Sequence, residues 1–352
     1  MIETRTYEGD AAQVADFAGR VWQGTYAGKM MLPLWDARYF DWQLLSERPG
    51  GRDFLVAAYE GTKLVGSLLG EKFRFRLHDQ EFDATMGSWL TVDPEYRRQG
   101  VGIKLFEEQR RRHLEHDAKF HLGYGYTGAR MSMGPKFWKS FPDNTVLLGH
   151  VGFWARMFDP PLVSRWDLTL RDRLGSRILG AFQTRHPRPR LTGVYRRYRP
   201  EDLEDCLRLA HGLLNRVDMG YVWSAERLAH QLSGSDMPRT LVAERNGRVT
   251  GFVNWYLLDF LGRYALPGAM VDLMAFGSMS LAESKDLIRA ALDQMVEEGA
   301  KFALALRLPC YPFMPLAQTG WITMPRDFSL ICVKMDTSFP LDKARRLHIH
   351  WR

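Results

Sequence analysis

Two arginines and two glycines share one loop of the chain, at Arg97, Arg98, Gly100 and Gly102. Glycine lets a backbone adopt unusual dihedral angles and approach a ligand closely. A helix is predicted directly after the loop, and its first N–H groups have no partner inside the helix and lie at the positive end of its dipole. The loop is therefore predicted to bind a diphosphate through these N–H groups, with charge-assisted hydrogen bonds from the arginines.

The elements on either side of the loop would position it. A strand is predicted to end at the Asp93-Pro94 turn, because Pro94 lacks an N–H and biases Asp93 away from helical geometry. The pattern lacks the third glycine of the dinucleotide fingerprint and the Lys-Ser/Thr of a Walker loop. The alternative to a phosphate site is a tight strand-to-helix turn on a solvated basic face.

The whole stretch resembles the acyl-CoA loop of the GCN5-related N-acetyltransferase (GNAT) superfamily, L-x-V-x-P-x-x-R-x-x-G-x-G-I-x-x-L. The matching residues are Leu90, Val92, Pro94, Arg97, Gly100, Gly102, Ile103 and Leu105. The resemblance implies direct acyl transfer from coenzyme A to an amine, with acetyl-CoA as the expected co-substrate and no metal. It implies CoA binding by Leu90, Thr91, Val92, Arg97, Arg98, Gln99, Gly100, Val101 and Gly102. The chain is then expected to be a GNAT-type acetyltransferase.

Composition narrows the class of protein. The 352 residues have the apolar and charged fractions of an ordinary soluble protein, and no apolar run is long enough to span a bilayer. The N-terminus has no apolar signal core, and three cysteines in no metal or redox spacing favour a reducing cytoplasm. The net charge of +7 suits an anion such as coenzyme A, and it also fits nucleic acid or an anionic membrane surface. Of these partners, we expect nucleic acid less. The oligomeric state is not predicted.

Two sequence patterns occur twice in the same order, which indicates a duplicated fold. The strand-then-helix pattern at residues 4–20 returns at residues 195–214, and the strand pair beginning at Phe54 is matched by one beginning at Thr240. The second copy lacks the basic loop: Glu283 would repel a phosphate there, and Ser280 is predicted to cap the helix instead. The second half is expected to be architectural or to wall a substrate pocket.

The predicted fold class is α/β (α+β), with two tandem acetyltransferase-fold domains, each a mixed, mostly antiparallel sheet flanked by helices. Residues 1–158 form the domain with the acyl-CoA loop, and 159–191 form a linker that contains a helix. Residues 192–338 form the degenerate second domain, and 339–352 form a mobile tail. The first domain is expected to end in a hairpin over residues 144–157.

Catalysis by such an enzyme requires a base for the acceptor's ammonium, and an acid for the departing thiolate is optional. GNAT enzymes often place a tyrosine acid in the short helix where this chain has Trp138, so Tyr124 or Tyr126 on the preceding strand are the candidate acids. Glu71 is the candidate base, and His121 is an alternative on the strand face opposite to Tyr124. The tyrosines could equally pack on the sheet, and Glu71 could be a solvated surface residue.

Aromatic residues crowd the region between the first helix and the first strand pair, where GNAT enzymes wall the acceptor pocket. They are Trp22, Tyr26, Trp35, Tyr39, Phe40 and Trp42. They could stack on an acceptor or form core. The acceptor is expected to be a small-molecule or peptide amine. The alternatives are an aminoacyl or longer-chain acyl transferase on the same doubled fold, or a non-catalytic acyl-CoA-binding protein.

Overall fold

The described residues of the chain form three sheets. The structure is a computed structural model that describes residues 1–44, 47–87, 89–126, 133–182, 194–341 and 344–351. The first sheet has the order β1 (Ile2–Thr6), β3 (Leu55–Glu60), β4 (Lys63–Leu69), β7 (Thr91–Val92). Helix α3 (Val101–Glu115) packs closely on this sheet. The approach needs glycine at Gly66 of β4, because a Cβ there would lie 2.9 Å from Val101 and 3.1 Å from Leu105.

The second and third sheets combine strands from both halves of the sequence. The second has the order β19 (Leu347–His348), β12 (Met219–Tyr221), β5 (Glu71–Leu77), β6 (Gln80–Met86), β8 (Phe120–Tyr126), β18 (Phe328–Lys334), β9 (Thr145–Val151). The third has the order β11 (Val194–Arg197), β13 (Pro238–Arg245), β14 (Arg248–Leu261), β15 (Ala265–Ala275), β16 (Phe302–Leu306), β10 (Phe153–Met157), β17 (Ile322–Thr323), and β2 (Leu32–Leu34) pairs with β14.

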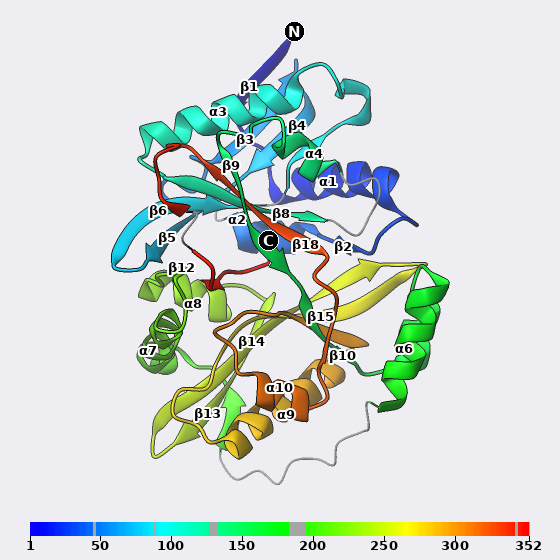
Figure 1. Cartoon of the computed structure of the whole chain (residues 1–352), viewed down its shortest axis with the longest axis vertical. Coiled ribbons are helices and arrows are strands. Elements are labelled where there is room, and N and C mark those ends of the chain that lie inside the picture. Colours follow the sequence, from blue (N-terminus) through cyan, green and yellow to red (C-terminus); the bar gives the residue numbers. More distant parts are fainter. Residues whose placement is uncertain (45–46, 88, 127–132, 183–193, 342–343, 352) are drawn as a thin grey trace.

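Helices pack against these sheets, as Figure 1 shows. In the N-terminal half they are α1 (Ala11–Tyr26), α2 (Ala37–Leu44), α3 and α4 (Gly134–Trp138). In the sequence, α5 (Pro160–Trp166) and α6 (Leu170–Phe182) come between the two halves. The C-terminal half has α7 (Leu203–Leu214), α8 (Ala225–Ser233), α9 (Leu281–Glu297) and α10 (Phe313–Gln318). Ser280 caps α9 and forms a capping box with Glu283, which confirms the predicted helix start.

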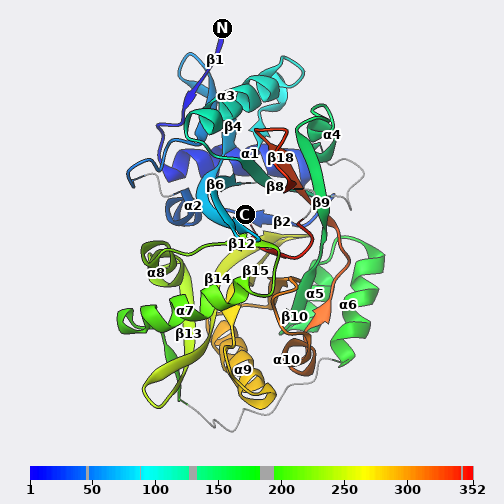
Figure 2. The ribbon, with the colours of Figure 1, turned by 60° about the vertical axis from the view of Figure 1, so that its left-hand side comes forward.

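The two halves exchange their last strands. β18 lies between β8 and β9 in the upper half of the molecule, and β10 lies between β16 and β17 in the lower half (Figures 1 and 2). The predicted hairpin over residues 144–157 is therefore wrong, because β9 and β10 belong to different sheets. An alternating strand pattern specifies which face is buried but not which strand is the partner. The sequence did not indicate that strands on opposite sides of the predicted domain boundary at residue 158 would pair with each other.

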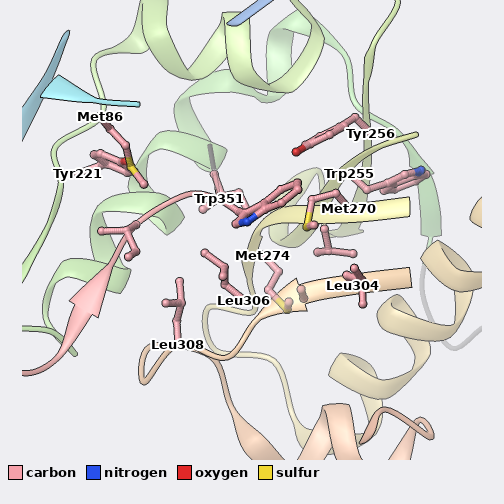
Figure 3. Packing of buried hydrophobic residues seen from close by; sticks show 14 of the residues in the cluster. Met86, Tyr221, Trp255, Tyr256, Met270, Met274, Leu304, Leu306, Leu308 and Trp351 are labelled. Atoms are coloured by element: carbon pink, nitrogen blue, oxygen red, sulfur yellow. The ribbon is translucent and has the colours of Figure 1, made fainter. Parts of the chain in front are cut away.

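The C-terminal tail is buried, so the prediction that it is mobile is wrong. β19 pairs in parallel with β12, and His348, Ile349 and His350 are each 0% exposed. Figure 3 shows Trp351 inside a core that includes Met86 from the first half and Met270 from the second. Histidines read as polar in a sequence, but burial lowers the pKa of His348 to about 3 and keeps it neutral at pH 7. Within the described ranges, no helix is long and apolar enough to cross a membrane.

Candidate functional site

The site lies where the strand pair β6–β8 separates. β8 pairs with β6 up to Met86 and Leu122, and the Gly87 N–H still donates to the Leu122 carbonyl oxygen at 3.0 Å. Beyond Gly87 the chain leaves this sheet and joins the first sheet as β7, which pairs with β4. β7 and β8 therefore diverge and leave a wedge between them.

A cavity of about 220 Å³ occupies this wedge. One end is lined by Val92, Arg97 and Gly102 beside the basic loop. Side chains from the exchanged strands and from the C-terminal half line the cavity as well, namely Phe153, Phe260, Leu304, Phe328 and Trp351. The strand exchange thus builds the cavity wall, and the second half contributes directly to the site.

The loop at the cavity has the geometry of an anion site. Gly100 precedes α3 with a φ of 79°, a left-handed conformation that glycine adopts without strain. The first helical hydrogen bond runs from the Lys104 N–H to the Gly100 carbonyl oxygen, so the preceding N–H groups of the first turn lie at the positive helix end. A Cβ at Gly102 would lie 2.9 Å from the Phe137 ring, so only glycine leaves this ring undisturbed.

The basic residues of the loop divide between two tasks. The Arg97 guanidinium donates to the Val92 carbonyl oxygen at 3.2 Å and to Thr25 Oγ1 at 2.8 Å, and so ties the loop to β7 and α1. Gln99 Nε2 donates to the Glu95 carbonyl oxygen at 2.8 Å. Arg98 is exposed, with a φ of 64°. Arg97 therefore shapes the loop, and phosphate binding by the backbone N–H groups, Arg97 and Arg98 stays a prediction.

Both predicted acid tyrosines line the cavity. The Tyr124 hydroxyl donates to the His350 carbonyl oxygen at 2.7 Å, which ties β8 to the C-terminal tail. Tyr126 is half-buried beside the Phe328 ring, and burial raises the pKa of its hydroxyl, so it stays protonated near pH 7. Tyr126 lies five positions along β8 from His121, or roughly 16 Å, so the two side chains lie at different parts of the cavity. The acid role of either tyrosine stays a prediction.

Glu71, the predicted base, is not among the residues that line the cavity. Its Oε1 accepts a 2.6 Å hydrogen bond from Arg227 of α8, and the Arg227 guanidinium also stacks on the Phe73 ring. Glu71 is only 6% exposed, so the pair is shielded from solvent. The contact joins β5 of the first half to α8 of the second, so Glu71 helps to hold the two halves together. No local pattern in the sequence pairs Glu71 with Arg227.

We expect the variant Glu71→Gln to keep its acyl-transfer rate within about threefold and to lose stability. The amide can still accept from Arg227, but the charge-assisted part of the bond is gone, which costs about 1–3 kcal/mol. Thiol release and the urea midpoint measure the two effects. A rate loss above about 100-fold at unchanged stability would restore Glu71 as the base.

The aromatic crowd divides between site and core. Trp22, Tyr26 and Trp35 line the cavity, whereas Tyr39, Phe40 and Trp42 are fully buried core residues. Trp138 occupies the place of the usual tyrosine, lines the cavity and packs edge-on against Phe106. The core reading is confirmed for Tyr39, Phe40 and Trp42, and stacking of the cavity-lining aromatics on an acceptor stays a prediction.

Comparisons with known proteins agree with this geometry. Residues 4–132 match the family model described as the acetyltransferase (GNAT) domain. The chain as a whole has the tandem GNAT fold. No curated protein sequence matches it.

Solved structures with the same fold include three of Saccharomyces cerevisiae N-myristoyltransferase with bound myristoyl-CoA, one of them with inhibitors as well. Each is 15% identical and covers 94% of this chain. The shares of the yeast chains covered are 82%, 78% and 80%, with TM-scores of 0.73, 0.71 and 0.72. At this identity the similarity shows the fold.

Proposed function

We propose that the protein is an acyl-CoA-dependent N-acyltransferase that moves an acyl group directly from coenzyme A to an amine. The observation that carries the proposal is the cavity between β7 and β8, with the first turn of α3 beside one end. The helix end would bind the diphosphate of CoA through its N–H groups. The pantetheine arm would lie in the wedge, where main-chain groups along β7 can pair with its amides.

The donor we propose carries an acyl chain longer than acetyl. Away from the loop, the lining is mostly aromatic and aliphatic, including Trp35, Phe260 and Leu304, and a methyl group would fill little of it. Burying an acyl chain stabilises binding by about 0.8 kcal/mol per methylene. The myristoyl-CoA bound by the yeast structures of the same fold supports this choice. The acceptor is an amine of a small molecule or a peptide.

A thioester panel tests the proposal. Acetyl-, butanoyl-, octanoyl- and myristoyl-CoA are offered with benzylamine, lysine or a short peptide with a free N-terminus, and thiol release is followed. We expect kcat/KM to rise at least about tenfold from acetyl- to octanoyl-CoA. If transfer were fastest from acetyl-CoA, the proposed longer acyl chain would be wrong, but the proposed acyl transfer would stand. Calorimetric CoA binding without transfer to any amine would instead indicate a non-catalytic acyl-CoA-binding protein.

We expect Trp351→Ala to shift the donor preference towards longer acyl chains. Its ring lines the cavity and contacts Trp35, Phe153 and Phe260. Room for two further methylenes would change the ratio of kcat/KM between long and short thioesters about tenfold. Trp154→Ala is the matched control, because Trp154 is 3% exposed but does not line the cavity. An equal shift in both variants would count against the placement of the acyl chain.

A further inference from the structure

A buried polar cluster lies behind the cavity, between α3 and the strands β6 and β8. His113 and Thr85 are 0% exposed and His121 is 2% exposed. Thr85 Oγ1 lies 2.8 Å from His113 Nε2 and 2.8 Å from His121 Nδ1, and His113 Nδ1 lies 2.7 Å from the Gln109 carbonyl oxygen. His121 also lines the cavity, so the chain of contacts leads from the helix interior to the site.

These three contacts allow one arrangement of protons when both rings are neutral. The Gln109 carbonyl oxygen can only accept, so His113 Nδ1 carries the hydrogen and its Nε2 accepts from the Thr85 hydroxyl. That hydroxyl has a single hydrogen, so its oxygen must accept from His121 Nδ1. His121 Nε2 is left as a lone-pair acceptor. Burial supports neutrality, because it lowers the pKa of His113 to about 3 and that of His121 to about 4.

The vertex of the wedge places a second acceptor near this nitrogen. A Cβ built on Gly123 would lie 2.9 Å from the Gly87 carbonyl oxygen and 3.9 Å from His121 Nε2, so both atoms flank the same small space. The Gly87 carbonyl oxygen can only accept, so it faces the Nε2 lone pair of the neutral ring and gains a hydrogen bond only when His121 is protonated. The carbonyl would therefore stabilise an imidazolium after Nε2 takes up a proton.

Packing alone does not account for the cluster. The side-chain amide of Gln109 is 0% exposed, and neither its nitrogen nor its oxygen has a hydrogen-bond partner among the described residues. A Cβ at Gly70 would lie 2.8 Å from this amide nitrogen and 3.2 Å from Thr85 Oγ1, so Gln109 belongs to the same cluster. Buried polar atoms without partners reduce stability, and they concentrate where a site needs polar groups.

We propose that His121 is the general base of the proposed acyl transfer, and that Thr85 and His113 are positioning residues that fix its tautomer. This inference rests on the proposed function. The acceptor's ammonium first loses one proton to water. The neutral amine nitrogen then attacks the thioester carbonyl carbon, a C–N bond forms, and a second proton passes from the nitrogen to His121 Nε2. The C–S bond then breaks, the sulfur takes the proton from His121, and the amide and free CoA leave.

The variant His121→Ala tests the base directly. We expect kcat to fall at least about 100-fold, which is typical for loss of a general base, while the Kd for CoA stays within about threefold. Added imidazole should restore part of the rate by entering the vacated space, an effect that a purely structural histidine would not show. His150→Ala, an exposed histidine on β9, is the matched control and should keep the wild-type rate.

The isosteric variant Thr85→Val tests the positioning. In protein labelled with ¹⁵N-histidine, nitrogen shifts should assign the Nδ1–H tautomer to His121 in the wild type and a tautomer mixture in Thr85→Val. A wild-type Nε2–H tautomer, or His121→Ala with full activity, would overturn the inference and leave the acyltransferase proposal standing. Failure of the wild type to transfer any acyl group would overturn the proposed function itself.

Discussion

Replacing Gly102 by glutamate is expected to weaken CoA binding at least about 100-fold, or about 2.7 kcal/mol. Gly102 is the second residue of α3 and lines the cavity beside the proposed diphosphate position. A carboxylate about 4 Å from a phosphate charge is repelled by about 4 kcal/mol at an effective dielectric constant of 20. Isothermal titration with CoA measures the loss.

The control for this variant comes from the duplicated half. Ala282 is the second residue of α9 and is exposed, so Ala282→Glu places the same charge at the equivalent helix position. It should leave CoA binding unchanged. Gly277 is unsuitable, because a Cβ there would lie 2.7 Å from the Thr250 carbonyl oxygen and disturb the fold. Equal losses of CoA binding in Gly102→Glu and Ala282→Glu would count against the assignment of the CoA site to the N-terminal half.

Gly102→Glu must also be shown to fold. The new side chain displaces the Phe137 ring, which lies 2.9 Å from a Cβ built at this position. Circular dichroism and the thermal midpoint should therefore stay close to those of Gly102→Ala, which makes the same collision without the charge. If Gly102→Ala alone abolished binding, the loss would reflect Phe137 and not repulsion of the diphosphate.

Local patterns predicted the parts of the site that depend on local chemistry. The Asp93-Pro94 turn, Gly100 and the start of α3 follow from residues within a few positions of each other, and the structure has the turn and the helix there. The cap at Ser280 follows from Glu283 for the same reason. The CoA-binding roles of all nine predicted residues stay predictions, namely those of Leu90, Thr91, Val92, Arg97, Arg98, Gln99, Gly100, Val101 and Gly102.

Contacts between distant segments could not be predicted from the same patterns. Phe153 and Trp351 line the cavity, although both are far in sequence from the basic loop beside it. No sequence pattern near either residue indicates that it would line this cavity. Glu71 reads as an available carboxylate until Arg227 is placed beside it. His121 was expected to face away from Tyr124, yet both line the cavity. The cavity runs along the edge of β8 that, among the described residues, pairs with β6 only as far as Leu122, so side chains from both faces of the strand can border it.

The exchange of strands predicts that the two halves stay together after the chain is cut between them. A protease site inserted between Phe182 and Val194 would separate the sequence into its two halves, each of which supplies a strand to the other's sheet. β18 pairs with β8 along Phe120–Tyr126 and with β9 on its other edge, so its removal would leave two unpaired edges. We expect the cut protein to elute from gel filtration as one particle of unchanged size.

The same cut distinguishes exchange from two independent domains. Denaturing electrophoresis should show two fragments, while thermal unfolding of the cut protein should remain a single cooperative transition, because neither sheet is complete without the other half. Residues 1–158 expressed alone should not fold, because their second sheet would lack β18, β12 and β19. Fragments that separate on gel filtration, or a folded 1–158, would show that each half completes its own sheet. The cavity wall built by Phe153 and Phe328 would then have to be assigned anew.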